Sequence, residues 1–149
     1  MKFAVGYQLP EEGEEPLVDV VEDFREHIEE VYFPWLDMPS GRSPMTSQGG
    51  IVDWEAQRKL EADLVAFRKM GIKLNLLLNA SCYGRYGFSR HLANFVCSVI
   101  AHLQELVGLD AVITMSPMIA STVKRNFPDI EVRASVNMRL GTVKAMEYA

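Results

Sequence analysis

Short apolar segments alternate along the chain with longer segments in which apolar residues recur every three or four positions. The short segments predict strands, and the longer segments predict amphipathic helices. Parallel strands need crossovers of about a dozen or more residues, which the helical segments supply. The sequence therefore predicts an α/β fold with parallel strands. The expected strands begin near Phe3, Glu30, Ile72, Ala111 and Glu131.

The number of βα units limits the architecture. Five units are too few for a closed eight-stranded barrel, which typically takes about 250 residues. The last helical segment, Lys144 to Ala149, also stops where the printed sequence stops. We therefore expect residues 1–149 to form a single α/β domain that is the N-terminal part of a larger TIM-barrel-like protein.

Capping residues mark the starts of several helices. Asp53, Ser89 and Ser116 each precede a helical segment, and Pro117 stands where the first turn of a helix accepts proline. The second, third and fourth helices are expected to begin after these residues. The first helix is expected to carry one buried stripe, formed by Leu17, Val20, Val21, Phe24 and Ile28.

Two long loops follow predicted strands directly. One runs from Leu36 to Gly50 and the other from Ala80 to Phe88. In parallel α/β folds, the loops at the C-terminal ends of the strands carry the ligand site. Arg42, in the first loop, is either an anion contact or an ordinary exposed arginine.

Polar residues alternate with apolar ones along the predicted strands. Helices are expected to cover the apolar faces, so the polar faces point into the barrel interior. The interior of a structural barrel is filled mainly by Val, Ile and Leu, and buried polar groups need partners. The residues expected on the polar faces are Glu30, Tyr32, Lys73, Asn75, Asn79, Thr114, Ser116, Arg133, Ser135 and Asn137.

Two interpretations of these faces remain open. One is a self-contained hydrogen-bond network, with Glu30 paired to Arg133 or Lys73. The other is a ligand pocket formed by the polar residues nearest the strand ends together with the loop around Cys82. The predicted ligand-binding residues are Asn79, Cys82, Tyr83, Arg85, Ser116, Ser135 and Asn137; no catalytic residue can be assigned.

Composition narrows the classes of function. The apolar content of 48% and charged content of 23% are ordinary for a globular domain. The net charge is −5, residues 1–30 hold ten acids against two bases, and no basic stripe occurs, so nucleic acid is not an expected partner. No apolar run could span a membrane, no secretory signal begins the chain, and Cys82 and Cys97 lack ligand spacing. We expect a cytoplasmic protein without a metal or cofactor of its own.

Several segments resemble the collagenase-like peptidases, the U-thirty-two peptidase family. Segment 28–33 is similar to that family's "A-D-x-V-Y" segment, although Pro34-Trp35 stands in place of its glycine-bearing loop. Segment 76–79 resembles a family strand that ends in Asn. Segments 109–113 and 127–130 resemble its "D-A-hydrophobic, helix, FPD" pattern, and segment 131–137 resembles its "H-x-S-x-Q-x-N" strand.

The resemblance implies a TIM-barrel-like fold and a hydrolase of the peptidase type acting on a peptide or small molecule. Some relatives carry an iron–sulfur cluster, but two cysteines cannot supply its four thiolate ligands. A non-catalytic module that binds a ligand or partner is the alternative. Unpaired strand edges also favour self-association or binding of the missing C-terminal half of the barrel.

Overall fold

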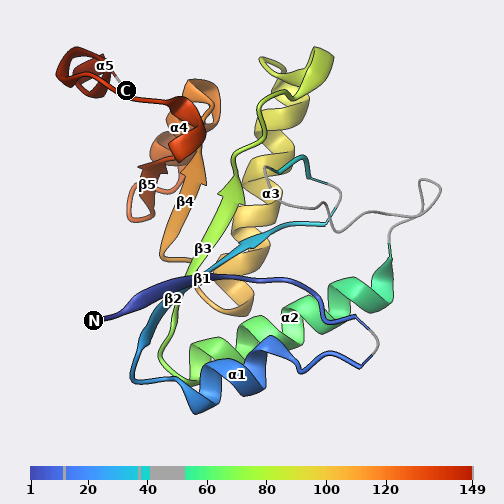
Figure 1. Ribbon diagram of the computed structural model, residues 1–149. Helices are drawn as coiled ribbons and strands as arrows, with labels where there is room; N and C mark the ends of the chain where they lie inside the picture. Colours follow the sequence, from blue (N-terminus) through green and yellow to red (C-terminus); the bar gives the residue numbers. More distant parts are fainter. Residues whose placement is uncertain (12, 37, 41–52, 149) are drawn as a thin grey trace.

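The computed structural model describes residues 1–11, 13–36, 38–40 and 53–148. Its strands are β1 (Phe3–Gly6), β2 (Ile28–Pro34), β3 (Lys73–Leu78), β4 (Ala111–Thr114) and β5 (Glu131–Ala134) (Figure 1). Its α-helices are α1 (Leu17–Asp23), α2 (Trp54–Lys69), α3 (Arg90–Leu106), α4 (Pro117–Asn126) and α5 (Val143–Tyr148). The single-turn 3₁₀ helices η2 (Gly84–Tyr86) and η3 (Val136–Met138) follow β3 and β5. This confirms the predicted α/β class.

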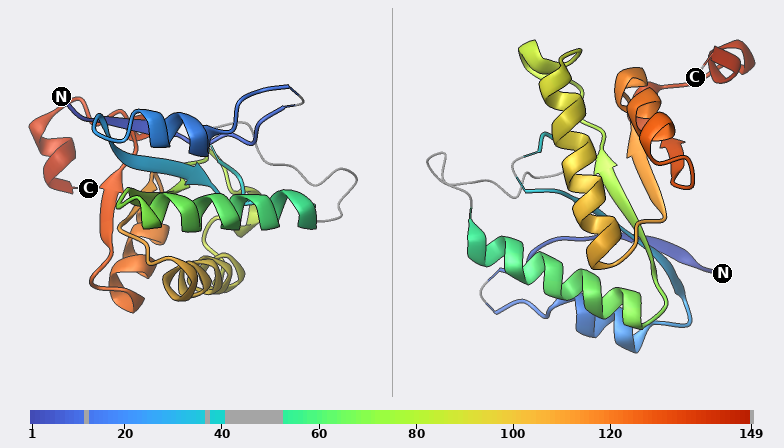
Figure 2. Two further views of the ribbon diagram at one scale, coloured as in Figure 1. Left: turned by 90° about the horizontal axis from the view of Figure 1, so that it is seen from below. Right: turned by 180° about the vertical axis from the view of Figure 1, so that it is seen from behind.

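All five strands are parallel and pair in the order β1-β2-β3-β4-β5. Each strand therefore lies beside its successor. Because βα crossovers are right-handed, a sheet wound in one direction carries its helices on one face. Seen from below, α1, α2, α3 and α4 follow one another in an arc around the strands (Figure 2). This is the architecture of part of a β/α barrel, and it differs from a doubly wound sheet, whose strand order reverses.

The hydrophobic core lies between the sheet and this arc of helices. Leu74, Leu76 and Leu78 are fully buried in it, as the alternation along the third strand predicts. The opposite face of the sheet, called here the inner face, carries the intervening residues. The strand register places Glu30 beside Lys73 and Tyr32 beside Asn75 on that face.

The predicted helix starts are confirmed by capping hydrogen bonds. Asp53 Oδ1 accepts from two backbone N–H groups at the start of α2, and Ser89 Oγ accepts from the Leu92 N–H at the start of α3. Ser116 caps α4 in the same way, before Pro117. The described residues contain no helix long and apolar enough to cross a membrane.

Two strand and helix boundaries differ from those expected. α1 ends at Asp23, because residues 24–27 form turns in which the His27 N–H donates to the Phe24 carbonyl (2.8 Å). Ile28 therefore begins β2 and does not extend the helical stripe. β5 ends at Ala134, since Ser135 starts the η3 turn, and Val136 is 90% exposed.

The facing of the fourth strand also differs. Thr114 was expected on the inner face, but its register partners are Leu78 and Ala134, and Leu78 belongs to the helix-covered core. Ala111 and Ile113 lie on the inner face instead, paired with Asn75 and Leu77. The expectation was wrong because every residue of this short strand except Thr114 is apolar, so alternation alone does not fix its phase.

Candidate functional site

The C-terminal ends of the five parallel strands meet at one edge of the sheet, called here the rim. The predicted site residues follow three of these ends: β3, β4 and β5. The connection after β2 also reaches the rim, but residues 41–52, including Arg42, lie outside the described part of the chain. The rim is the part of this fold where ligands are usually bound.

Three predicted residues come together on the inner side of the rim: Asn79, Ser135 and Asn137. The Asn137 side-chain amide donates to the backbone carbonyl of Asn79 (3.1 Å), although β4 lies between the strands that precede these two residues. Ser135 is 4% exposed, and its Oγ accepts from the Asn137 N–H (3.2 Å). A left-handed residue, Arg139 (φ 51°), ends the η3 turn. The bond between Asn137 and Asn79 thus joins the ends of β3 and β5.

A charged network lies deeper on the inner face. Glu30 Oε2 accepts from Arg133 Nη1 (2.6 Å) and from Asn75 Nδ2 (2.7 Å). Arg133 Nη2 also donates to Glu131 Oε2 (2.8 Å), which holds the pKa of Glu131 below its ordinary value. The Glu30–Arg133 pair confirms one form of the self-contained network. Lys73 does not join it, since its ammonium group pairs with Glu29 (2.9 Å).

One atom of this network has no partner among the described residues. Asn75 is 1% exposed, and its Oδ1 accepts no hydrogen bond there. An unsatisfied buried acceptor is unusual in a folded protein. The polar groups of the inner face are therefore satisfied in large part by one another, and Asn75 Oδ1 is the exception.

The loop after β3 supplies three more predicted residues. Cys82 is exposed, and its sulfur accepts from the Gly84 N–H (3.2 Å). Arg85 is also exposed; its Nη2 donates to the Tyr86 hydroxyl (2.7 Å), and its guanidinium carbon lies 4.9 Å from the centre of the Tyr86 ring. A guanidinium carries five N–H donors, so this exposed side chain can also donate to a ligand.

Tyr83 turns towards the core. Its hydroxyl is buried without a hydrogen-bond partner among the described residues. Burial raises the pKa of Tyr83 to about 12. The nearby Ala80 backbone acts in the opposite direction and lowers this pKa, although it does not form a hydrogen bond with the Tyr83 hydroxyl.

Ser116 is engaged at the start of α4 and not in the hydrogen bonds that join Asn79, Ser135 and Asn137. Its Oγ accepts from the Ile119 N–H (3.4 Å) at the start of α4, and its own N–H donates to Thr114 Oγ1 (3.0 Å). The structure therefore places Ser116 as a helix cap beside Thr114.

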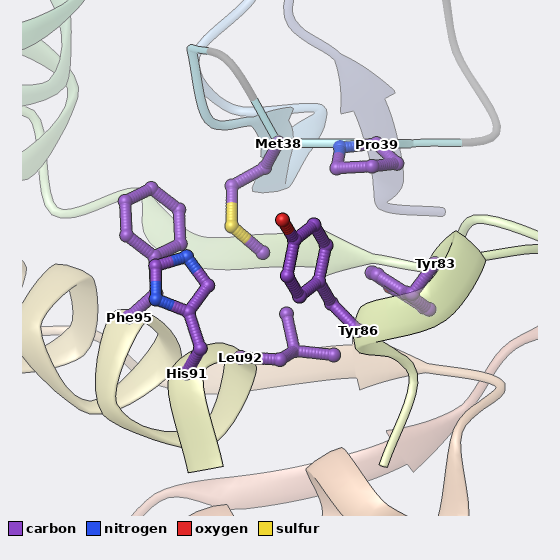
Figure 3. Close-up of a pocket in the computed structure, with 7 residues that line it drawn as sticks. All are labelled: Met38, Pro39, Tyr83, Tyr86, His91, Leu92 and Phe95. Carbon is purple, nitrogen blue, oxygen red and sulfur yellow. The ribbon is translucent and has the colours of Figure 1, made fainter. Parts of the chain in front are cut away.

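A pocket of about 270 Å³, called here the aromatic pocket, opens beside the Cys82 loop (Figure 3). Its walls come from the segment after β2, the loop after β3 and the first turns of α3. In Figure 3 the His91 and Phe95 rings lie together on one side, and the Tyr86 ring stands across from them. The Tyr86 and His91 ring centres are 5.3 Å apart. The lining residues are Met38, Pro39, Tyr83, Tyr86, His91, Leu92 and Phe95.

Of these lining residues, Tyr83 and Tyr86 belong to the loop that the sequence marks as a candidate ligand contact, and the other five were not predicted. Met38 and His91 are far apart in the sequence, and nothing in either segment alone marks a shared cavity. One signal was present: Tyr86, Phe88 and Phe95 are three aromatic residues near the start of one helix, and they are 44%, 91% and 38% exposed. Exposed aromatic residues that gather in one region commonly mark a binding surface.

The chemistry of these groups favours binding. Among the described residues, no cluster of three or more His, Cys, Asp or Glu side chains could hold a metal ion. The Cys82 thiol is hydrogen-bonded to no histidine in the same described ranges, and the His102 ring is engaged with Glu61 Oε1 (3.0 Å). The described residues of the rim present amides, hydroxyls, the Arg85 guanidinium and an apolar pocket.

Comparison with known proteins supports the fold. No protein-family model matches the chain, and no curated protein matches it significantly. A solved structure, that of the U32 peptidase Mk0906, is similar with a TM-score of 0.67 and 15% sequence identity. The match covers 97% of this chain and 53% of that chain, so this chain spans about half the length of that structure. The chain therefore has a fold similar to that of about half of this structure.

Proposed function

We propose that this chain binds peptides at the rim, as part of a peptidase-like α/β barrel. The observation that carries the proposal is the bond from the Asn137 side chain to the Asn79 backbone, which brings two amide-bearing residues together between strand ends. Primary amides offer both donors and acceptors, which is what an extended peptide backbone requires. The likeness to the fold of a peptidase supports a peptide as the ligand.

Peptide hydrolysis is the second candidate. The exposed Cys82 thiol at the rim and the peptidase-like fold favour it. A cysteine nucleophile is normally activated by a neighbouring base, and the described residues offer no base bonded to Cys82. Binding without turnover is therefore the function that the described residues support best.

Fluorescein-labelled gelatin peptides test the proposal by fluorescence polarisation. The Asn137→Ala variant should bind about three- to tenfold more weakly, the usual worth of one or two hydrogen bonds. Asn126→Ala is the matched control, because Asn126 is also exposed and its amide donates to a backbone carbonyl (that of Thr122, 2.8 Å) at the far end of α4. Equal affinities in the two variants would contradict the proposal.

The same peptides separate binding from hydrolysis. New amino termini, detected with fluorescamine during a long incubation, would establish turnover. Cys82→Ser should abolish turnover if the thiol is the nucleophile, and it should leave polarisation unchanged if the chain only binds. Binding without new amino termini is the result that we expect.

A further inference from the structure

The aromatic pocket is the right size for one side chain. Its volume is about 270 Å³. Pockets for whole small-molecule ligands usually measure about 300–1,000 Å³, whereas a cavity of about 150 Å³ is enough to bind benzene. A phenyl or indole ring therefore fits, with the remainder of its ligand outside the pocket.

The lining explains which kind of side chain suits it. Met38, Leu92 and Phe95 offer carbon and sulfur surfaces, and Leu92 is only 6% exposed. The Tyr86 and His91 rings contact each other, with their centres 5.3 Å apart and a tilt of 49°, so a third ring can pack against the edges of this pair. Thioether–aromatic contact with Met38 adds to this preference.

A positive charge stands at the edge of the pocket. Arg85 Nη2 donates to the hydroxyl of Tyr86, a lining residue, and the Arg85 residue is exposed. Guanidinium groups bind carboxylates in paired geometry. An apolar cavity with one guanidinium at its edge suits a ligand that carries an aromatic ring and a carboxylate a few atoms apart.

We propose that the aromatic pocket binds the C-terminal residue of a peptide when that residue is aromatic, with Arg85 contacting its carboxylate. The proposal rests on the proposed peptide-binding function and names the part of the peptide that is recognised. It assigns roles to Arg85, Tyr86 and His91 that are separate from the amides of the inner rim.

Four labelled peptides test the inference: fluorescein-Gly-Ala-Gly-Phe, its C-terminal amide, fluorescein-Gly-Ala-Gly-Ala and fluorescein-Gly-Ala-Gly-Lys. The Phe peptide should bind about tenfold or more tightly than the Ala peptide, because burying one aromatic side chain contributes most of the difference. The amide should bind about two- to fivefold more weakly than the acid, as expected for an exposed charge pair. The Lys peptide should bind no more tightly than the Ala peptide.

Variants of the chain assign the two contacts. His91→Trp places an indole at the pocket from an exposed position and should reduce the Phe peptide to the affinity of the Ala peptide. Arg85→Gln should remove the difference between acid and amide while retaining the preference for Phe. Arg58→Gln, at an exposed position on α2, is the control and should change neither. A circular-dichroism melt of each variant verifies that it is folded.

The outcomes separate the inference from the function on which it rests. If gelatin peptides bind and respond to Asn137→Ala but the Phe and Ala peptides bind equally, the pocket inference is overturned and the proposed function stands. If N-acetylphenylalanine binds to the wild type but not to His91→Trp, while no peptide binds to either, the pocket inference stands and the proposed peptide-binding function is overturned. An acid–amide difference that survives Arg85→Gln would overturn the role of Arg85.

Discussion

At the scale of single residues, the polar groups of the inner face differ in what surrounds them. Glu30 and Arg133 bond to each other with side chains that are 16% and 31% exposed. Lys73 and Glu29 form a similar pair with side chains that are 47% and 43% exposed. The sequence predicted the inner face of β2, β3 and β5 and left Glu30 two possible partners, Arg133 and Lys73, because β-alternation is readable wherever a strand carries several polar residues. It could not predict that Lys73 would turn to Glu29.

This difference in exposure gives a stability prediction. Arg133→Met keeps the aliphatic stem but leaves Glu30 without its cation, and we expect it to lower the free energy of unfolding by about 1–3 kcal/mol. Lys73→Met removes an exposed pair and should change stability by less than about 1 kcal/mol. Urea unfolding of both variants measures the contrast. Equal losses of stability in the two variants would mean that the Glu30–Arg133 pair is as solvated as the exposed Glu29–Lys73 pair.

Two tyrosines with buried hydroxyl groups give a second prediction. The Tyr7 hydroxyl donates to Asp63 Oδ2 (2.8 Å), whereas the Tyr83 hydroxyl has no partner among the described residues. Tyr7→Phe should cost about 1–2 kcal/mol at pH 7, since a buried carboxylate loses a donor. Tyr83→Phe should be neutral or slightly stabilising. A large loss of stability in Tyr83→Phe would reveal a partner for its hydroxyl.

The same tyrosine predicts a pH dependence. The pKa of Tyr83 is raised from 10.0 to about 12 by burial, so the folded state holds this proton more tightly than the unfolded state. Its contribution to stability is complete below pH 10 and is lost as the pH rises through 12. Between pH 10 and pH 12 the wild type should lose more stability than Tyr83→Phe, as urea unfolding at pH 9 and pH 11 can measure. Parallel losses would contradict the buried position of the hydroxyl.

At the scale of helices and strands, starts were easier to predict than ends. Asp53, Ser89 and Ser116 marked three helix starts because a cap depends on a few neighbouring residues. The end of an element depends on what the next segment packs against. Ile28 therefore belongs to β2 and not to the first helix, and β5 ends before Ser135. The aromatic pocket was missed for a similar reason, since its walls come from three separate segments.

Ser116 shows how these two kinds of role can be separated. Ser116 caps α4, so Ser116→Ala should lower the free energy of unfolding by about 1 kcal/mol. Because the Ser116 hydroxyl is engaged in capping α4, we expect no change in the affinity for labelled gelatin. If Ser116→Ala lost affinity for gelatin without losing stability, Ser116 would be a binding residue and not only a helix cap.

At the scale of the whole molecule, β1 and β5 are the edge strands of the sheet that the described residues form. Unpaired strand edges pair readily with other chains. Eight strands close a β/α barrel of this kind, and the described residues supply five. The five βα units predicted from the sequence are confirmed there, and the chain spans about half the length of the similar solved structure.

We therefore expect the isolated chain to self-associate through an edge. Phe3 is 53% exposed on β1, and Phe3→Lys places a charge on that edge, which should lower the average mass measured by light scattering. Phe88→Lys alters a 91% exposed phenylalanine outside the strands and serves as control. A wild type that stays monomeric and unfolds cooperatively with high stability would contradict the expectation.

The most direct test of a peptide site at the rim is a titration of the ¹⁵N-labelled chain with Gly-Ala-Gly-Phe, followed by ¹H–¹⁵N correlation spectra. We predict that the shifts concentrate in residues 79–95 and 135–139, including the side-chain amide of Asn137. Residues at the N-terminal ends of the strands, where Arg68 bonds to Asp110 (2.6 Å), should show no shifts. Shifts confined to those N-terminal ends, or no saturable shifts at all, would contradict a binding site at the rim.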